Sequence, residues 1–200
     1  MKILLFGNSY VRYLERLGNW DRELSLTGGK RVDCRFFFKS HPGKDYTYLL
    51  KNPQEFGIIR EFNPDVIIVI LGGNSIGSKH SNPEINDLAS RFYSKLKEVV
   101  RSDCLKLAVQ IEPRFVDAGN RFGTPEAEEF NRRRTVVNNY VNKKLKKYGL
   151  VDGVIMLGSV NYLRDPKYFS DGVHLNTEGL LMYKDAVIGG LVYALEKKNV

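Results

Sequence analysis

A chain of 200 residues is long enough to bury the core of one α/β domain, and we interpret residues 1–200 as a single domain. Hydrophobic residues make up 42% of the chain and charged residues 27%, the balance of an ordinary globular protein, and no apolar run is long enough to cross a bilayer. The formal net charge of +8 permits attraction to nucleic acid or to an anionic membrane surface, but charge alone identifies neither partner.

The two cysteines and the apolar run near the N-terminus indicate the cellular compartment of the protein. Cys34 and Cys104 have no metal-like spacing, so we expect buried thiols in a reducing environment. The apolar run Ile3–Phe6 is too short for a signal peptide and ends in no cleavage pattern. We therefore expect a cytoplasmic protein whose first apolar run is a strand.

Apolar runs alternate with amphipathic stretches along the chain, which is typical of a parallel sheet with helices on both faces. The predicted strands are Lys2–Phe6, Arg31–Lys39, Val66–Leu71, Leu105–Ile111 and Val154–Met156. The predicted helices are Val11–Leu17, Tyr46–Leu50, part of Pro53–Phe62, Ile85–Val100, Pro125–Tyr148 and Thr177–Lys197. Because ligands of such sheets bind beyond the carboxyl ends of the strands, the polar turns that follow the strands are the places to look for a site.

The first of these turns is Gly-Asn-Ser, which interrupts the run ILLFGNSYV. Ser9 lies where a buried strand gives way to a helix, so its hydroxyl faces the crevice and the helix N-terminus favours developing negative charge. Serine is also a leading N-cap residue. Ser9 is therefore either a helix cap or a nucleophile, and a nucleophile needs a base.

Histidine is the commonest general base, and the chain contains His41, His80 and His174. His174 follows Asp171 by three residues in DGVHLN, so one loop can supply both the base and the carboxylate that orients it. The alternative is an Asx-turn at Asp171 with a partly buried loop histidine. We interpret His41 and His80 as loop residues.

Two further turns can supply hydrogen-bond donors to an oxyanion. Asn74 follows two glycines at the end of the most apolar strand, where its amide can donate into the crevice or stabilise a turn. Gly43, in SHPGKD, can offer a bare backbone amide or occupy the positive-φ position of a turn.

The segments LLFGNSYV, Gly43, ILGGNS and DGVHLN resemble, in order and approximate spacing, the sequence blocks of the SGNH (GDSL-type) hydrolases. The resemblance spans nearly the whole chain. It implies that Ser9 is the nucleophile, that Asp171 and His174 complete the triad, and that Ser9, Gly43 and Asn74 form the oxyanion hole. Two residues depart from the family pattern: Asn8 replaces the Asp that is usual in the first block, and Ser75 replaces the Asp that often follows the Asn of the third block.

The resemblance also implies the fold and the reaction. The fold is a three-layer α/β/α flavodoxin-like architecture, here with a five-stranded parallel sheet. The reaction is hydrolysis of an ester, thioester or related acyl bond, with no metal or other cofactor. A narrower resemblance, through GNSYVRYLE and the basic charge, is to the esterase domain of the first open reading frame protein of animal non-LTR (LINE-type) retrotransposons, which implies a lipid-like substrate.

Two helices suggest partners. The stretch NRRRTVVNNYVNKKLKKYG is either a solvated helix face or a phosphate-binding surface for nucleic acid; its basic residues are Arg132, Arg133, Arg134, Lys143, Lys144, Lys146 and Lys147. The helix Thr177–Lys197 is apolar on more than one side, so any apolar surface beyond the core forms a homodimer interface or an acyl-binding wall.

Two other functions compete with the esterase. A binding module of the same fold that holds RNA or DNA through the basic helix requires no catalysis. A nucleotide-binding flavodoxin-like protein is disfavoured because the chain has neither a G-x-x-x-x-G-K-[ST] loop nor a G-x-G-x-x-G motif.

Overall fold

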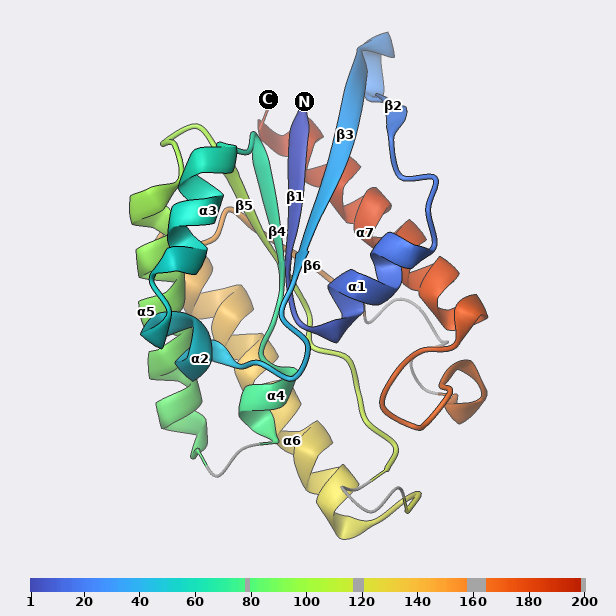
Figure 1. Ribbon diagram of the computed structural model, residues 1–200. Coiled ribbons are helices and arrows are strands. Elements are labelled where there is room, and N and C mark those ends of the chain that lie inside the picture. Colours follow the sequence, from blue (N-terminus) through green and yellow to red (C-terminus); the bar gives the residue numbers. More distant parts are fainter. Residues whose placement is uncertain (78–79, 117–120, 158–164, 199–200) are drawn as a thin grey trace.

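The computed structural model describes residues 1–77, 80–116, 121–157 and 165–198, which include a six-stranded sheet (Figure 1). The strand order is β2-β3-β1-β4-β5-β6. The strands are β1 (Lys2–Gly7), β2 (Arg22–Ser25), β3 (Arg31–Ser40), β4 (Val66–Ile70), β5 (Leu105–Val109) and β6 (Gly153–Ile155). Strand β1 is central and pairs in parallel with both β3 and β4.

The prediction of five parallel strands is wrong by one strand. The sheet contains the five predicted strands in parallel and, in addition, β2, which pairs antiparallel with β3 at one edge. The sequence of β2 is RELS, and only Leu24 in it is buried. An edge strand with one buried side chain has no continuous apolar run, which is why the pattern did not reveal it.

Helices cover both faces of the sheet. The helices are α1 (Ser9–Arg16), α2 (Tyr46–Lys51), α3 (Gln54–Phe62), α4 (Gly73–Ile76), α5 (Asn82–Val99), α6 (Pro125–Tyr140) and α7 (Thr177–Lys198). Helices α1 and α7 lie on one side of the sheet, and α2, α3, α5 and α6 lie on the other (Figure 1). The prediction of a three-layer α/β/α fold is confirmed.

The central strands are buried on both faces, which explains their continuous apolar sequences. In β1, Ile3 and Leu5 belong to the core under α1 and α7, whereas Leu4 and Phe6 belong to the core under α3 and α5. Side chains alternate between the faces of a strand, so a strand covered on both sides needs apolar residues at every position.

Two helical details differ from the predictions. The stretch predicted as one helix, Pro125–Tyr148, consists of α6, which ends at Tyr140, followed by a π-helical turn at Val141–Leu145. The four-residue helix α4 begins at the second of the two glycines after β4 and was not predicted. Within the described ranges, no helix combines the length and the apolar character needed to span a membrane.

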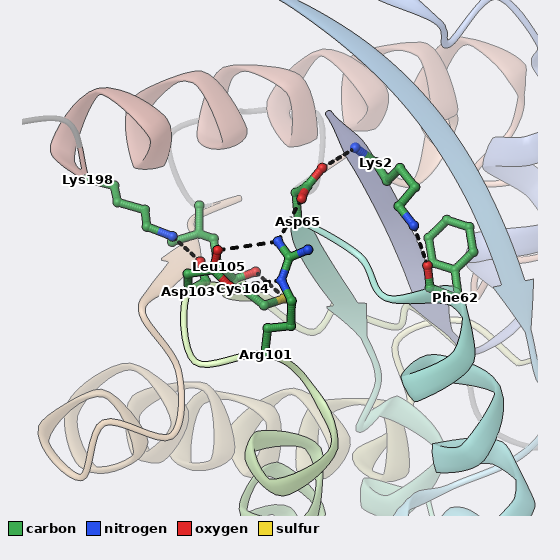
Figure 2. Close-up of polar contacts among 8 residues, drawn as sticks. All are labelled: Lys2, Phe62, Asp65, Arg101, Asp103, Cys104, Leu105 and Lys198. Carbon is green, nitrogen blue, oxygen red and sulfur yellow. Dashed lines mark hydrogen bonds and ion pairs between the residues drawn. The ribbon is translucent and has the colours of Figure 1, made fainter.

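A polar network ties the amino ends of β1, β4 and β5, at the opposite end of the sheet from α4 (Figures 1 and 2). The Asp65 carboxylate accepts hydrogen bonds from the Lys2 backbone N–H at 2.7 Å and from the Arg101 guanidinium at 2.8 Å. The Lys2 ammonium donates to the carbonyl of Phe62 at 2.6 Å. The hydrogen bond from Lys2, aided by Arg101, holds the pKa of Asp65 below its usual range.

We predict that Asp65→Asn lowers the free energy of unfolding at pH 7 by about 1 kcal/mol, because Asn cannot attract Arg101 by charge and the site is partly exposed. A carboxyl whose pKa is lowered in the folded state stabilises the fold above its unfolded pKa and ceases to do so as pH falls through its folded pKa. The difference between the variant and the wild type should therefore shrink as the pH falls through the lowered pKa of Asp65 and vanish below it. Urea denaturation at several pH values measures it, with the exposed Asp87→Asn as control. A difference that does not change with pH would contradict the account.

Candidate active site

Ser9 is the first residue of α1, and Asn8 caps that helix. The Asn8 side-chain oxygen accepts the backbone N–H of Tyr10 at 3.0 Å, while Asn8 itself is in an extended conformation. The alternative that Ser9 is the helix cap is therefore wrong. The change from Asp to Asn at position 8 keeps a side-chain oxygen that can cap the helix, and the Ser9 hydroxyl is left for another role.

The ends of β1 and β4 approach closely at Gly7. The Asn8 backbone N–H donates to the carbonyl of Ile70 at 2.9 Å, and a Cβ on Gly7 would lie 1.9 Å from that carbonyl oxygen. Only glycine allows this approach. It fixes the direction in which the chain leaves β1 and so places Ser9 at the carboxyl end of the sheet.

Ser9, His174 and Asp171 form a hydrogen-bonded chain. The Ser9 Oγ lies 3.2 Å from His174 Nε2, and His174 Nδ1 lies 2.8 Å from Asp171 Oδ2. An ionised carboxylate only accepts, so Asp171 requires the proton on Nδ1 and leaves Nε2 as an acceptor for the Ser9 hydroxyl. The structure thus brings together residues that are 165 positions apart in the sequence.

The Asx-turn considered for Asp171 is also present. Its second carboxylate oxygen, Oδ1, accepts the backbone N–H groups of Val173 at 2.9 Å and His174 at 2.6 Å. Burial raises the pKa of Asp171, but the hydrogen bonds from His174 and Val173 outweigh burial and leave the pKa below its usual range. The turn and the contact with the imidazole therefore use different oxygens of one carboxylate.

Two tyrosines of α1 hold the histidine loop. Tyr10 donates its hydroxyl proton to the carbonyl of Val173 at 2.7 Å, and burial raises its pKa well above the ordinary value. The Tyr13 ring meets the His174 ring edge to face, with centroids 5.2 Å apart. The helix that begins with Ser9 thus also positions the imidazole.

Asn74 and Gly43 lie at the same cavity as Ser9 and His174. Asn74, on α4, donates one N–H to the carbonyl of Lys44 at 3.0 Å, and an amide nitrogen carries a second N–H. Gly43 has a φ of +72°, as the turn interpretation expects. The cavity has a volume of about 350 Å³ and is lined by Asn8, Ser9, Tyr10, Arg12, Tyr13, Pro42, Gly43, Gly73, Asn74, Ile111, Glu112, Pro113, Arg114, Phe130, Val173 and His174.

Three charged residues of this cavity were missed at the sequence level. Arg114 stacks on Phe130, 4.3 Å from the ring centroid, and its guanidinium lies 3.4 Å from the Asn74 side-chain oxygen. Glu112 is buried and accepts a hydrogen bond from a tyrosine hydroxyl of α7, and burial raises its pKa to about 7. Arg12 lies one helical turn after Ser9. Glu112 and Arg114 lie in the segment that follows the end of β5. A search of the segments beyond the carboxyl ends of the strands could therefore have found them.

The remaining residues singled out in the sequence have structural roles. Ser75 accepts the backbone N–H of Tyr46 at 3.3 Å, so the second departure from the family pattern is a buried structural contact. His41, predicted to be a loop residue, is buried with Nε2 3.3 Å from a Glu55 oxygen; burial lowers its pKa against the opposing effect of Glu55. His80 lies 3.4 Å from the Thr47 hydroxyl.

No protein-family model matches this sequence, and no curated protein matches it significantly. Solved structures do resemble it. A GDSL-like lipase from Bacteroides thetaiotaomicron has a TM-score of 0.65 at 11% identity, covering 100% of this chain and 89% of its own. The lipase/acylhydrolase from Enterococcus faecalis has a TM-score of 0.64 at 14% identity, covering 96% and 95%.

The acetylxylan esterase Axe2 from Geobacillus stearothermophilus has a TM-score of 0.62 at 15% identity, covering 94% of this chain and 93% of its own. At such low identity these likenesses establish the fold and nothing beyond it. The chain has the fold of the GDSL-like lipases and acetylxylan esterases, as its sequence blocks predicted.

We predict that Gly7→Ala lowers the free energy of unfolding by at least about 2 kcal/mol, because the new Cβ would overlap the Ile70 carbonyl and force β1 and β4 apart. Gly57→Ala in α3 is the matched control. It has open space around its Cβ position, so we expect stabilisation of about 0.5–1 kcal/mol. Chemical denaturation compares the two variants, and equal stability would refute the role assigned to Gly7.

Proposed function

We propose that the protein is a serine esterase that hydrolyses carboxylic esters through Ser9, His174 and Asp171. The observation that carries this proposal is the chain of contacts from Ser9 Oγ to His174 Nε2 and from His174 Nδ1 to Asp171 Oδ2. The capping of α1 by Asn8 supports it, because the Ser9 hydroxyl is then not needed to satisfy the helix.

The reaction follows from these contacts. His174 Nε2 takes the Ser9 proton as Oγ attacks the ester carbonyl, and Asp171 stabilises the imidazolium that forms. The tetrahedral intermediate collapses when His174 gives that proton to the departing alcohol oxygen. Water, deprotonated by His174, then attacks the acyl-enzyme and releases the carboxylic acid and free Ser9.

Three donors would stabilise the oxyanion: the backbone N–H groups of Ser9 and Gly43, and the second N–H of the Asn74 side chain. The first N–H groups of a helix have no partner within the helix, and the helix dipole adds positive potential at the same point. The bond from Asn74 to Lys44 and the contact between Arg114 and the Asn74 oxygen fix the orientation of the amide. Losing one such donor typically costs about 10²–10³ in kcat.

The size of the cavity supports short acyl groups. A volume of about 350 Å³ must hold both the acyl group and part of the alcohol, which favours acetyl and other short esters over long-chain lipids. A larger cavity of about 970 Å³, beside β6 and α7, contains none of Ser9, Gly43, Asn74, Asp171 and His174. The lipid-like substrate and the place in a retrotransposon protein stay predictions.

The basic helix supports nucleic-acid binding less well than its sequence suggested. Arg133 donates to the carbonyls of Ile76 and His80, and Arg134 donates to that of Ile111. Two of the arginines thus bond within the fold, and Arg132 pairs with Glu129. The four lysines of the segment are exposed. Nucleic-acid binding through them, and a homodimer through α7, remain secondary proposals.

We predict that Ser9→Ala lowers kcat for 4-nitrophenyl acetate by at least about 10³-fold, because the nucleophile is lost. Its thermal midpoint should match the wild type, because Asn8 and not Ser9 caps α1. Hydrolysis by both proteins across acyl chains from acetate upward measures the effect. The control is Ser94→Ala, on α5 across the sheet.

Equal rates for Ser9→Ala and the wild type would contradict the proposal. So would a wild type that is folded but inactive on every ester of the series. A profile that rises toward long acyl chains would contradict the preference for short acyl groups while leaving the nucleophile unaffected.

A further inference from the structure

Two arginines lie at the cavity that contains Ser9 and His174, and neither forms an ion pair with another described residue. Arg12 is on α1, three residues after Ser9, so both side chains lie on one side of the helix. Arg114 follows β5 and lies against Phe130. The salt bridges of the described residues pair other cations with carboxylates, but no described carboxylate is within 4.0 Å of Arg12 or Arg114.

Arg114 has partners inside the fold. Its guanidinium donates to the carbonyl of Gly73 and to the side chain of Asn74, both at 3.4 Å. Burial lowers its pKa, which means that its charged form is partly stripped of water. Arg114 therefore fixes Asn74 and also contributes positive potential to the cavity.

Arg12 has no comparable partner among the described residues. Its guanidinium carbon lies 5.5 Å from the centroid of the Tyr13 ring, and its Nε is buried with no hydrogen-bond partner among the described residues. A buried donor without a partner destabilises the fold, and a ligand that accepts a hydrogen bond from it would offset that cost. Arginine presents a planar fork of donors that fits a carboxylate or a phosphate.

The position of Arg12 relates it to the alcohol portion of the ester. The leaving oxygen must approach His174, which protonates it. The His174 ring packs against the Tyr13 ring, and the guanidinium carbon of Arg12 lies 5.5 Å from the centroid of that same tyrosine ring. Arg12 and His174 line the same cavity, so a substituent on the departing alcohol lies in the cavity that Arg12 lines.

Glu112 and Asp171 both favour the charged form of Arg114, but neither forms an ion pair with it, and only Glu112 lines the cavity. Asp171 is engaged by His174 and by two backbone N–H groups. Glu112 is held by a tyrosine hydroxyl of α7, and its raised pKa keeps much of it uncharged near neutral pH. The cavity therefore favours a negative ligand.

We propose that this site binds esters whose alcohol portion carries an anionic group, a carboxylate or a phosphate, and that Arg12 is the residue that recognises this group. The inference rests on the esterase function proposed above. It adds a substrate class, because Arg12 would discriminate among short esters by the charge of the alcohol.

Three acetate esters test the proposal: methyl 3-acetoxybenzoate, 3-acetoxybenzoate and 3-acetoxyphenyl phosphate. They share the acyl group and the ring and differ mainly in charge. For the wild type we expect kcat/KM for at least one anionic ester to exceed that for the neutral ester by about tenfold or more, the scale of one charge-assisted contact. The anionic ester with the higher kcat/KM shows whether the recognised group is a carboxylate or a phosphate.

Arg12→Leu should lower this ratio of anionic to neutral kcat/KM to about one, and Arg12→Lys should keep part of it. Arg16→Leu is the matched control: it removes one positive charge from the exposed face of the same helix and should keep the wild-type ratio. A wild-type ratio near one, or a ratio unchanged in Arg12→Leu, would overturn the proposal.

A binding measurement separates this proposal from the esterase function. We expect Ser9→Ala to bind phenyl phosphate or benzoate in titration calorimetry, and Ser9→Ala/Arg12→Leu to bind it at least about tenfold more weakly. If no ester is hydrolysed but this difference is found, the esterase proposal fails and the anion site stands. Equal binding by the two variants would overturn the anion site whether or not esters are hydrolysed.

Discussion

The contact between the ends of β1 and β4 is the constraint on which the candidate site depends. Gly7 lies so close to Ile70 that no side chain fits, and the Asn8 N–H bonds to the Ile70 carbonyl at 2.9 Å. The two central strands therefore end together. Asn8 then caps α1 and Ser9 begins it, while the chain leaving β4 reaches Asn74 four residues after Ile70. One backbone approach thus determines where the proposed nucleophile, Ser9, and the proposed oxyanion donor, Asn74, lie relative to each other.

Charged and polar groups orient the side chains of the candidate site. The N-terminus of α1 places the positive end of the helix dipole beside Ser9. Asp171 orients the His174 imidazole through one carboxylate oxygen and builds its own loop through the other. Arg114 fixes the Asn74 amide from its oxygen side. Each of these groups is held by contacts that exist before any ligand arrives, and such preorganisation makes charge stabilisation effective in a reaction.

Much of this arrangement could be predicted from the sequence because its signals are local. The doubly buried strands have continuous apolar runs. The proposed nucleophile Ser9 and the oxyanion donors Gly43 and Asn74 come soon after strands, and the proposed base and carboxylate come just before α7. The elements that the sequence did not predict depend on tertiary packing. Strand β2 buries only Leu24, so it resembles a loop, and α4 is a single turn.

The contacts of the arginines also depend on tertiary packing and could not be predicted from the sequence. Arg133 and Arg134 lie in a run that is typical of a solvated face, yet they donate to carbonyls of neighbouring segments. Arg12 lies in an ordinary amphipathic helix, and only the position of the His174 loop reveals that it lines the cavity. Which arginine is turned inward depends on residues far away in the chain, so no local pattern could indicate it.

The central claim is that Ser9 is a nucleophile activated by His174, and reaction with a fluorophosphonate tests it most directly. Attack by Ser9 Oγ on phosphorus forms an O–P bond and expels fluoride, and mass spectrometry of the digested protein locates the adduct. The account predicts one adduct per chain, on Ser9, and a rate at least about 10²-fold lower in His174→Ala. A folded protein that forms no adduct, an adduct on another residue, or an equal rate in His174→Ala would contradict the claim.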